Sequence, residues 1–169
     1  MLQYLHHRKK KGGWKTDLEE TKMGEKAGNN PDAYIYDSLV KAAIEMTEKS
    51  YAPYSNFHVG AALLDSNGKI WTGCNIENSA FGPSVCAERT AFFKAVSEGV
   101  YEFDAIAIVG GKEAPDGSVQ ITKYCPPCGV CRQVMSEFCT ANFTIVLDNG
   151  TGIRKIFTLA ELLPESFNL

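Results

Sequence analysis

The sequence predicts an α/β domain in which helices flank a mixed sheet of about five strands, arranged as three layers. Three observations lead to this fold class. Predicted helices and strands alternate along the chain, which is typical of layered α/β domains. One predicted strand, residues 104–109, is almost wholly apolar and therefore suits a sheet covered on both faces. The chain has 169 residues, 44% of them hydrophobic and 22% charged, which fits one globular domain.

The first half of the domain is predicted to form a helix and a β-hairpin. Asn30 is a favourable N-cap, and Pro31 suits the first helical position. Apolar residues then recur at spacings of three and four, which predicts an amphipathic helix over residues 32–48. Two β-rich segments, 57–64 and 69–74, are separated by an Asn-Gly turn and are typical of a hairpin.

The second half is predicted to alternate between helices and strands. We expect helices over residues 85–98, 128–138 and 158–163, and strands over residues 104–109, 143–147 and 153–157. A loop is expected over residues 110–124. Gly99 suits the position that follows a helix. The loop is inferred from its content of Gly, Pro and Asp. Thr158 with Glu161 forms a capping box for the last helix, which Pro164 ends.

Charge and hydropathy exclude some classes of protein. The net charge of −3 gives no sign of a nucleic-acid partner, and no apolar stretch approaches the roughly 20 residues of a membrane span. Residues 1–30 are net basic, and we expect them to be an N-terminal extension, disordered or artificial in origin, ahead of a single domain at 31–169. No apolar segment of a secretory signal follows the basic run, so the expected location is cytoplasmic.

The spacing of the cysteines indicates a metal site. Cys128 and Cys131 form a CxxC pair, which alone fits either a redox dithiol or half of a metal site. Cys86 stands about forty residues upstream, also at the start of a predicted helix. The positive end of a helix dipole favours the thiolate, the form of cysteine that binds metal. Three thiolates with one open position describe a catalytic zinc site.

Glu88 favours the catalytic interpretation. It lies two residues after Cys86, too close for a charge pair along a helix, but well placed to reach a metal-bound water beside that thiol. Its position argues against two other interpretations. Cys86 can be a small buried core residue. Alternatively, Cys74 or Cys125 can supply the fourth ligand of a structural zinc.

Five segments together resemble the zinc-dependent cytidine deaminases, in their short homotetrameric form. They are residues 86–91 (CAERTA), 127–133 (PCGVCRQ), 54–62, 73–78 and 162–164. The resemblance covers nearly all of the chain except its N-terminal tail, and it implies the three-layer cytidine deaminase-like fold. It also implies a cytoplasmic homotetramer that takes part in pyrimidine salvage.

The resemblance implies a reaction and a role for the residues around the metal. Cys86, Cys128 and Cys131 would hold one zinc ion per chain, with a water in the fourth position. Zinc-bound hydroxide would attack C4 of cytidine or 2′-deoxycytidine while Glu88 shuttles protons, giving uridine or 2′-deoxyuridine and ammonia. Arg89 would withdraw negative charge from the cysteine sulfurs.

The resemblance also implies a set of substrate contacts: Phe57, Asn75, Glu77, Ala87 and Phe167. Asn75 and Glu77 would bind the ribose hydroxyls and Phe57 the pyrimidine, whereas Phe167 would reach into the site of a neighbouring subunit. Two other functions are weighed against this one. One is deamination of another aminopyrimidine nucleoside such as blasticidin S, and the other is a non-catalytic structural zinc module. No nucleic-acid or membrane partner is expected.

Overall fold

The computed structural model describes residues 31–167, so the expected N-terminal extension and the Asn30 cap lie outside the described residues. The elements in chain order are α1 (Pro31–Thr47), β1 (Phe57–Asp65), β2 (Ile70–Cys74), α2 (Ala87–Ser97), β3 (Phe103–Glu113), β4 (Val119–Gln120), α3 (Gly129–Phe138), β5 (Thr144–Asp148), β6 (Arg154–Thr158) and α4 (Leu159–Leu162). None of these helices combines the length and the apolar run that crossing a membrane requires.

The strands form one mixed sheet in the order β2-β1-β3-β5-β6, with the two-residue strand β4 paired to the end of β3. The pair β3 and β5 is parallel, and the other pairs are antiparallel. A parallel pair needs a crossover connection, and α3 lies within the one between β3 and β5. The predicted mixed sheet is therefore confirmed, with a sixth short strand added.

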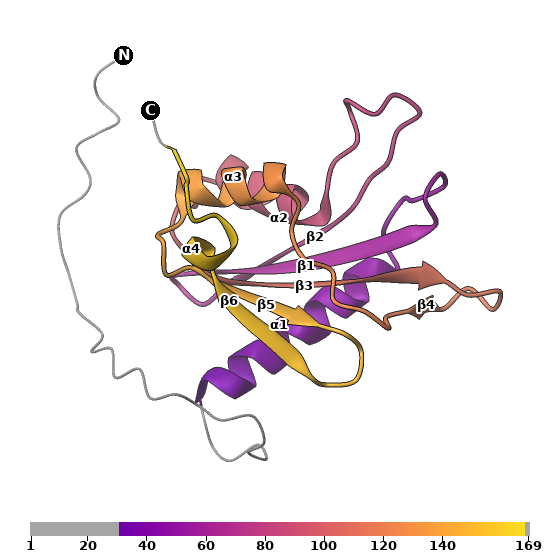
Figure 1. The fold of residues 1–169 in the computed structure, drawn as a ribbon, viewed down its shortest axis with the longest axis horizontal. Coiled ribbons are helices and arrows are strands. Elements are labelled where there is room, and N and C mark those ends of the chain that lie inside the picture. Colours follow the sequence, from indigo (N-terminus) through magenta and orange to yellow (C-terminus); the bar gives the residue numbers. More distant parts are fainter. Residues whose placement is uncertain (1–30, 168–169) are drawn as a thin grey trace.

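Helices cover both faces of the sheet, as predicted. Helix α1 lies on one face, and α2, α3 and α4 lie on the other (Figure 1). Strand β3 contributes to both cores because its side chains alternate in direction: Ile106 and Ile108 pack with the α2–α3 side, whereas Ala105, Ala107 and Val109 pack with α1. All five residues are 0–3% exposed. The apolar run of this strand thus predicted its double burial correctly.

The prediction of a loop over residues 110–124 was wrong in its first part. Strand β3 continues to Glu113 and pairs with β4 through Lys112–Gln120 and Glu113–Val119. In the sequence Gly111 indicates a loop, but in the structure it lets the backbones of β3 and the segment around β4 lie close together. A Cβ atom at this position would lie 2.2 Å from the carbonyl oxygen of Gln120.

Gly73 lets helix α2 sit directly on strand β2. A Cβ atom at this position would lie 2.4 Å from the carbonyl oxygen of Ala87 and 2.5 Å from the amide nitrogen of Ala91. The first turn of α2 is therefore held against the sheet by backbone contact. This turn carries Glu88 and begins next to Cys86.

A change of Gly73 to Ala is expected to be strongly destabilising. The added methyl group would push the start of α2 off the sheet, and such overpacking lowers the free energy of unfolding by about 1–3 kcal/mol or more. Denaturant unfolding measures this change. Gly82→Ala is the matched control, because a Cβ there meets nothing within 4 Å. Equal stabilities of the two variants would contradict this account of the α2–β2 contact.

Candidate active site

Three cysteine sulfurs from two helix starts meet in one place. Cys86 is the N-cap of α2, Cys128 is the N-cap of α3, and Cys131 lies in the first turn of α3. The Sγ atoms of Cys86 and Cys128 are 3.8 Å apart, and those of Cys128 and Cys131 are 3.5 Å apart. Tetrahedral zinc with Zn–S bonds of about 2.3 Å would separate its sulfur ligands by about 3.8 Å. The spacing of the three sulfurs therefore fits zinc.

The fold favours negative charge on these sulfurs. Neither N-cap thiol is engaged in a side-chain capping bond, and both stand at the positive end of a helix. Hydrogen bonds from Cys131, Arg89 and Cys128 lower the pKa of Cys86 to about 5. The same bond to Cys86, together with burial, raises the pKa of Cys131. Crowded thiols of this kind readily share a dication.

The other two candidate ligands do not join this group. Across residues 31–167, the cluster of mutually close ligand atoms consists of Cys86, Cys128 and Cys131. The sulfur of Cys74 instead lies 3.4 Å from the carbonyl oxygen of Lys49. Burial, with help from the charges of Glu88 and Cys86, raises the pKa of Cys125 to about 12, so that it stays a neutral thiol. The arrangement gives no support to a fully sulfur-ligated structural zinc.

Arg89 places a positive charge beside the sulfurs. One of its terminal nitrogens donates to the carbonyl oxygen of Ser84 at 2.9 Å and lies 3.9 Å from the sulfur of Cys86. Its Nε atom is buried without a hydrogen-bond partner in the described part of the chain. Arg89 thus has the position that charge tuning requires, and the tuning itself stays a prediction.

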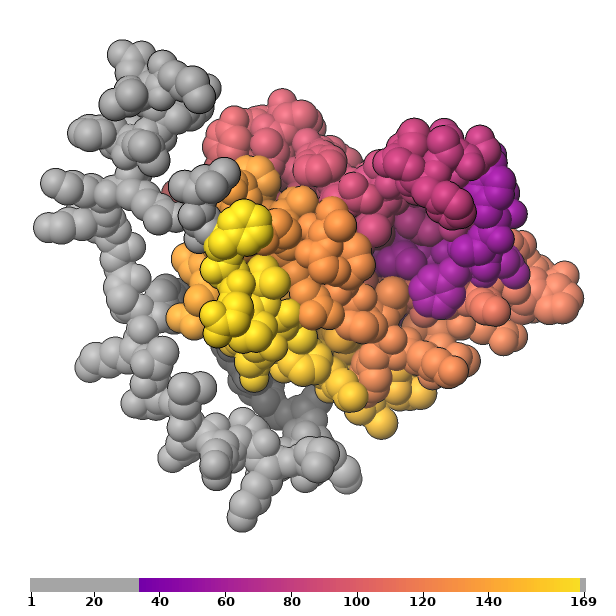
Figure 2. All heavy atoms as spheres, turned by 45° about the horizontal axis from the view of Figure 1, so that its top comes forward, coloured from indigo at the N-terminus to yellow at the C-terminus, as the bar shows by residue number. Residues whose placement is uncertain are grey.

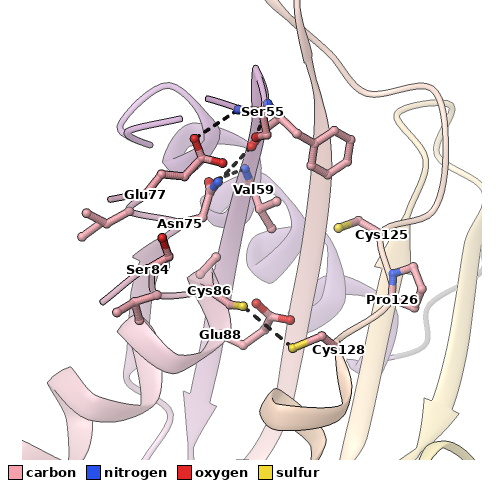
Figure 3. A pocket seen from close by; sticks show the side chains of 14 residues that line it. Ser55, Val59, Asn75, Glu77, Ser84, Cys86, Glu88, Cys125, Pro126 and Cys128 are labelled. Atoms are coloured by element: carbon pink, nitrogen blue, oxygen red, sulfur yellow. Dashed lines mark hydrogen bonds between the residues drawn. The ribbon is translucent and has the colours of Figure 1, made fainter. Parts of the chain in front are cut away.

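Glu88 lies in the first turn of α2 and is only 5% exposed. Figure 3 shows its carboxyl group pointing into the pocket, beside the sulfurs of Cys86 and Cys128. Burial, with the charge of Cys86 acting in the same direction, raises the pKa of Glu88 to about 7. A carboxyl group with such a pKa can both accept and donate a proton near neutral pH.

A cavity of about 350 Å³ opens above the sulfurs. It lies between the purple-to-magenta and orange parts of the surface in Figure 2. Its lining includes four of the five predicted substrate contacts: Phe57, Asn75, Glu77 and Ala87. Asn75 and Glu77 lie at the end away from Cys128 (Figure 3). The pocket thus joins an end with clustered sulfurs and a buried acid to a polar end.

Asn75 and Glu77 also hold the pocket wall together, which the motif alone did not reveal. The amide oxygen of Asn75 accepts from the backbone amide of Val59 at 2.8 Å, and its nitrogen donates to the carbonyl oxygen of Phe57 at 2.9 Å. Glu77 Oε2 accepts from the backbone amides of Tyr54 and Ser55 at 2.9 and 3.2 Å. Both side chains are thereby fixed before any ligand arrives.

Phe167 lies apart from the pocket of its own chain. Its side chain is 64% exposed and is not part of the pocket lining. Nearby, Arg132 donates to the carbonyl oxygens of Pro127 and Leu162, both at 2.8 Å. Arg132 therefore ties the cysteine loop to the C-terminal segment. Its motif context could not show this, because one partner is 30 residues away.

Comparisons with known proteins agree with this geometry. The family model of the cytidine and deoxycytidylate deaminase zinc-binding region matches residues 34–147. The cytidine deaminase of Sporosarcina psychrophila is 47% identical over 132 residues, which cover 78% of this chain and 90% of that protein. The blasticidin-S deaminase of Bacillus cereus is 33% identical over 128 residues, covering 75% and 87% respectively.

A solved structure of similar fold agrees with these sequence comparisons. The crystal structure of cytidine deaminase from Burkholderia pseudomallei superposes with a TM-score of 0.68 at 44% sequence identity, covering 78% of this chain and 98% of that one. The matched family region includes all three clustered cysteines and Glu88. From the family match, these sequence identities and a sulfur cluster spaced for zinc, it follows that this chain belongs to the zinc-binding cytidine and deoxycytidylate deaminase family.

Proposed function

We propose that this protein hydrolytically deaminates cytidine and 2′-deoxycytidine to uridine and 2′-deoxyuridine, with release of ammonia. The observation that carries the proposal is the buried carboxyl group of Glu88, which faces the pocket beside three sulfurs spaced for zinc. A structural zinc module has no need of a buried acid at this place. The polar far end of the same pocket suits the sugar of a nucleoside.

The reaction needs proton transfers that Glu88 is placed to perform. Cys86, Cys128 and Cys131 would hold zinc, which when bound acts as a Lewis acid and makes a coordinated water acidic near neutral pH. Glu88 takes a proton from the attacking water and gives it to N3 of the pyrimidine. It then takes the remaining proton from the hydroxyl group added at C4 and gives it to the amino group as the bond between C4 and nitrogen breaks. The water oxygen stays on C4, and ammonia leaves.

The substrate is proposed to lie with its base over the sulfurs and its ribose at the polar end. Phe57 and Ala87 provide apolar contact for the ring, and Asn75 with Glu77 provides polar groups for the hydroxyls. These two side chains favour a plain ribose over the different sugar part of blasticidin S. Loss of ultraviolet absorbance on adding cytidine, 2′-deoxycytidine and blasticidin S separately tests this assignment. Turnover of blasticidin S alone would overturn it.

The extent of the catalytic domain, its assembly and its cellular location are further parts of the proposal. We propose that residues 31–169 form the catalytic domain and assemble as a homotetramer with shared active sites. Phe167 supports sharing, because it is exposed and away from the pocket of its own chain. A reducing compartment such as the cytoplasm would keep all six cysteines as free thiols, including the three that would bind the metal.

Removal of the Phe167 ring is expected to raise KM or lower kcat for cytidine without unfolding the chain. If this ring completes a neighbour's pocket, its loss removes about 1–3 kcal/mol of apolar contact with the substrate site. Steady-state kinetics of Phe167→Ala, with unfolding as a check, provide the measurement. Tyr101→Ala is the control, since this 54% exposed aromatic follows the far end of α2. Unchanged kinetics of Phe167→Ala would remove the shared-pocket proposal.

A further inference from the structure

His58 occupies a junction that no catalytic motif explains. It lies on β1 between Phe57 and Val59, which both line the pocket. Because side chains alternate along a strand, His58 points to the other face of the sheet. Its side chain is 13% exposed, so its polar ring has to find partners inside the protein.

Those partners stand on either side of the ring. Nδ1 lies 2.6 Å from the hydroxyl oxygen of Ser50, which follows α1. Nε2 is buried and lies 3.4 Å from Glu113 Oε2 at the end of β3, close enough for ionic attraction but not aligned as a hydrogen bond. The bond to Ser50 is therefore the stronger link.

The protons of this junction can be assigned by counting. The Ser50 hydroxyl has one proton and donates it to the carbonyl oxygen of Thr47 at 2.7 Å, since a carbonyl can only accept. The hydroxyl oxygen must then accept from His58, so Nδ1 carries a proton. Thr47 is the last residue of α1, so this chain of bonds connects β1 to the end of that helix.

The link between Ser50 and His58 closes the loop of residues 51–56. This loop donates the two backbone amides, from Tyr54 and Ser55, that hold Glu77 Oε2. The Ser55 hydroxyl and these amides keep the pKa of Glu77 below its ordinary value. The orientation of Glu77 in the pocket thus depends on a loop whose two ends His58 joins.

We propose that His58 is a positioning residue for nucleoside binding: by bonding Ser50 it fixes the loop 51–56, and the loop in turn fixes Glu77. The proposal rests on the proposed function, because it assigns Glu77 to the sugar of the substrate. His58 touches neither the substrate nor the metal ligands. Its loss should therefore weaken substrate binding and leave the chemical step intact.

Two substitutions of His58 distinguish the roles of its two ring nitrogens. His58→Asn keeps an amide nitrogen near the place of Nδ1, where it can donate to Ser50. His58→Gln carries its amide near the place of Nε2 and loses the Ser50 bond. We expect His58→Gln to raise KM for cytidine about five- to tenfold, the factor that corresponds to one or two ordinary hydrogen bonds, with kcat within about twofold of wild type. His58→Asn should restore KM.

Ser50→Ala tests the same bond from its other side. It should raise KM at least as much as His58→Gln does, because the bond to the Thr47 carbonyl is lost as well. Combining the two changes should add little to the effect of Ser50→Ala, since both remove the bond between Ser50 and His58. Glu113→Gln is the control and should keep the wild-type KM. Hydrogen–deuterium exchange of the segment 51–57 gives an independent readout. Exchange should be faster in His58→Gln and Ser50→Ala and near wild type in His58→Asn.

The outcomes distinguish this inference from the proposed function. If the wild type converts cytidine but His58→Gln keeps its KM and its exchange rate, the positioning role is wrong and the function stands. Equal impairment of His58→Asn and His58→Gln would also overturn it, because the ring would then act through bulk alone. If the wild type shows no turnover of cytidine, the proposed function fails, and the exchange rates of His58→Gln, His58→Asn and Ser50→Ala decide the positioning role by themselves.

Discussion

Replacing Glu88 with Gln is expected to lower kcat for cytidine by about 10²- to 10⁴-fold, the range that general acid–base catalysis supplies. The amide has nearly the shape of the carboxyl group but cannot take up or release a proton. Since burial already disfavours the charged carboxylate, the neutral amide should fit the same space. Zinc content and unfolding temperature should therefore stay near those of the wild type.

An ultraviolet assay of cytidine conversion, with metal analysis and thermal unfolding of the same preparations, measures this effect. Glu98→Gln is the matched control, because Glu98 lies at the other end of α2 and forms only an exposed ion pair with Lys69. It should retain wild-type turnover. Full activity of Glu88→Gln would show that this carboxyl group takes no part in catalysis and would favour a structural role for the metal.

Features encoded by neighbouring residues could be predicted from the sequence. Thr158 and Glu161 form the predicted capping box, with the hydroxyl of Thr158 accepting from the Glu161 amide at 3.3 Å and the carboxylate accepting from the Thr158 amide at 2.6 Å. The apolar run of β3 likewise predicted burial on both faces. Such features can be predicted from the spacing of apolar residues within an element and from the residue types at its ends.

Features that join distant segments could not be predicted in this way. Gly111, near the end of β3, resembles a loop residue in the sequence, because its effect depends on how closely β4 approaches. The bonds of Arg132 to Leu162 and of Asn75 to the backbone of β1 cross the fold. The proposed contact of Phe167 with a second copy of the chain is likewise not encoded by any pattern within one chain. The candidate site was found because its cysteines and Glu88 occur in two short motifs.

Loss of Cys128 is expected to abolish both zinc binding and deamination. Cys128 supplies one of three clustered sulfurs, and its Sγ lies within 3.8 Å of the other two. With two thiolates left, the tetrahedral ligand set is incomplete, and zinc affinity should fall by several orders of magnitude, because structural Zn²⁺ sites derive about 10–16 kcal/mol from their full set of ligands. Mass spectrometric metal analysis should find about one zinc ion per chain in the wild type and almost none in Cys128→Ala.

Cys139→Ala separates this expectation from a general effect of removing cysteine. Cys139 caps the opposite end of the same helix, α3, and burial raises the pKa of its thiol to about 12. It should therefore keep zinc and turnover, even if it loses a little stability. Zinc retained at wild-type level in Cys128→Ala would mean that another group completes the site, and the three-thiolate arrangement would be wrong. Cys128 is exposed whereas Cys131 is buried, so truncation of Cys128 leaves the core intact. A loss of turnover in Cys128→Ala would therefore result from loss of the metal.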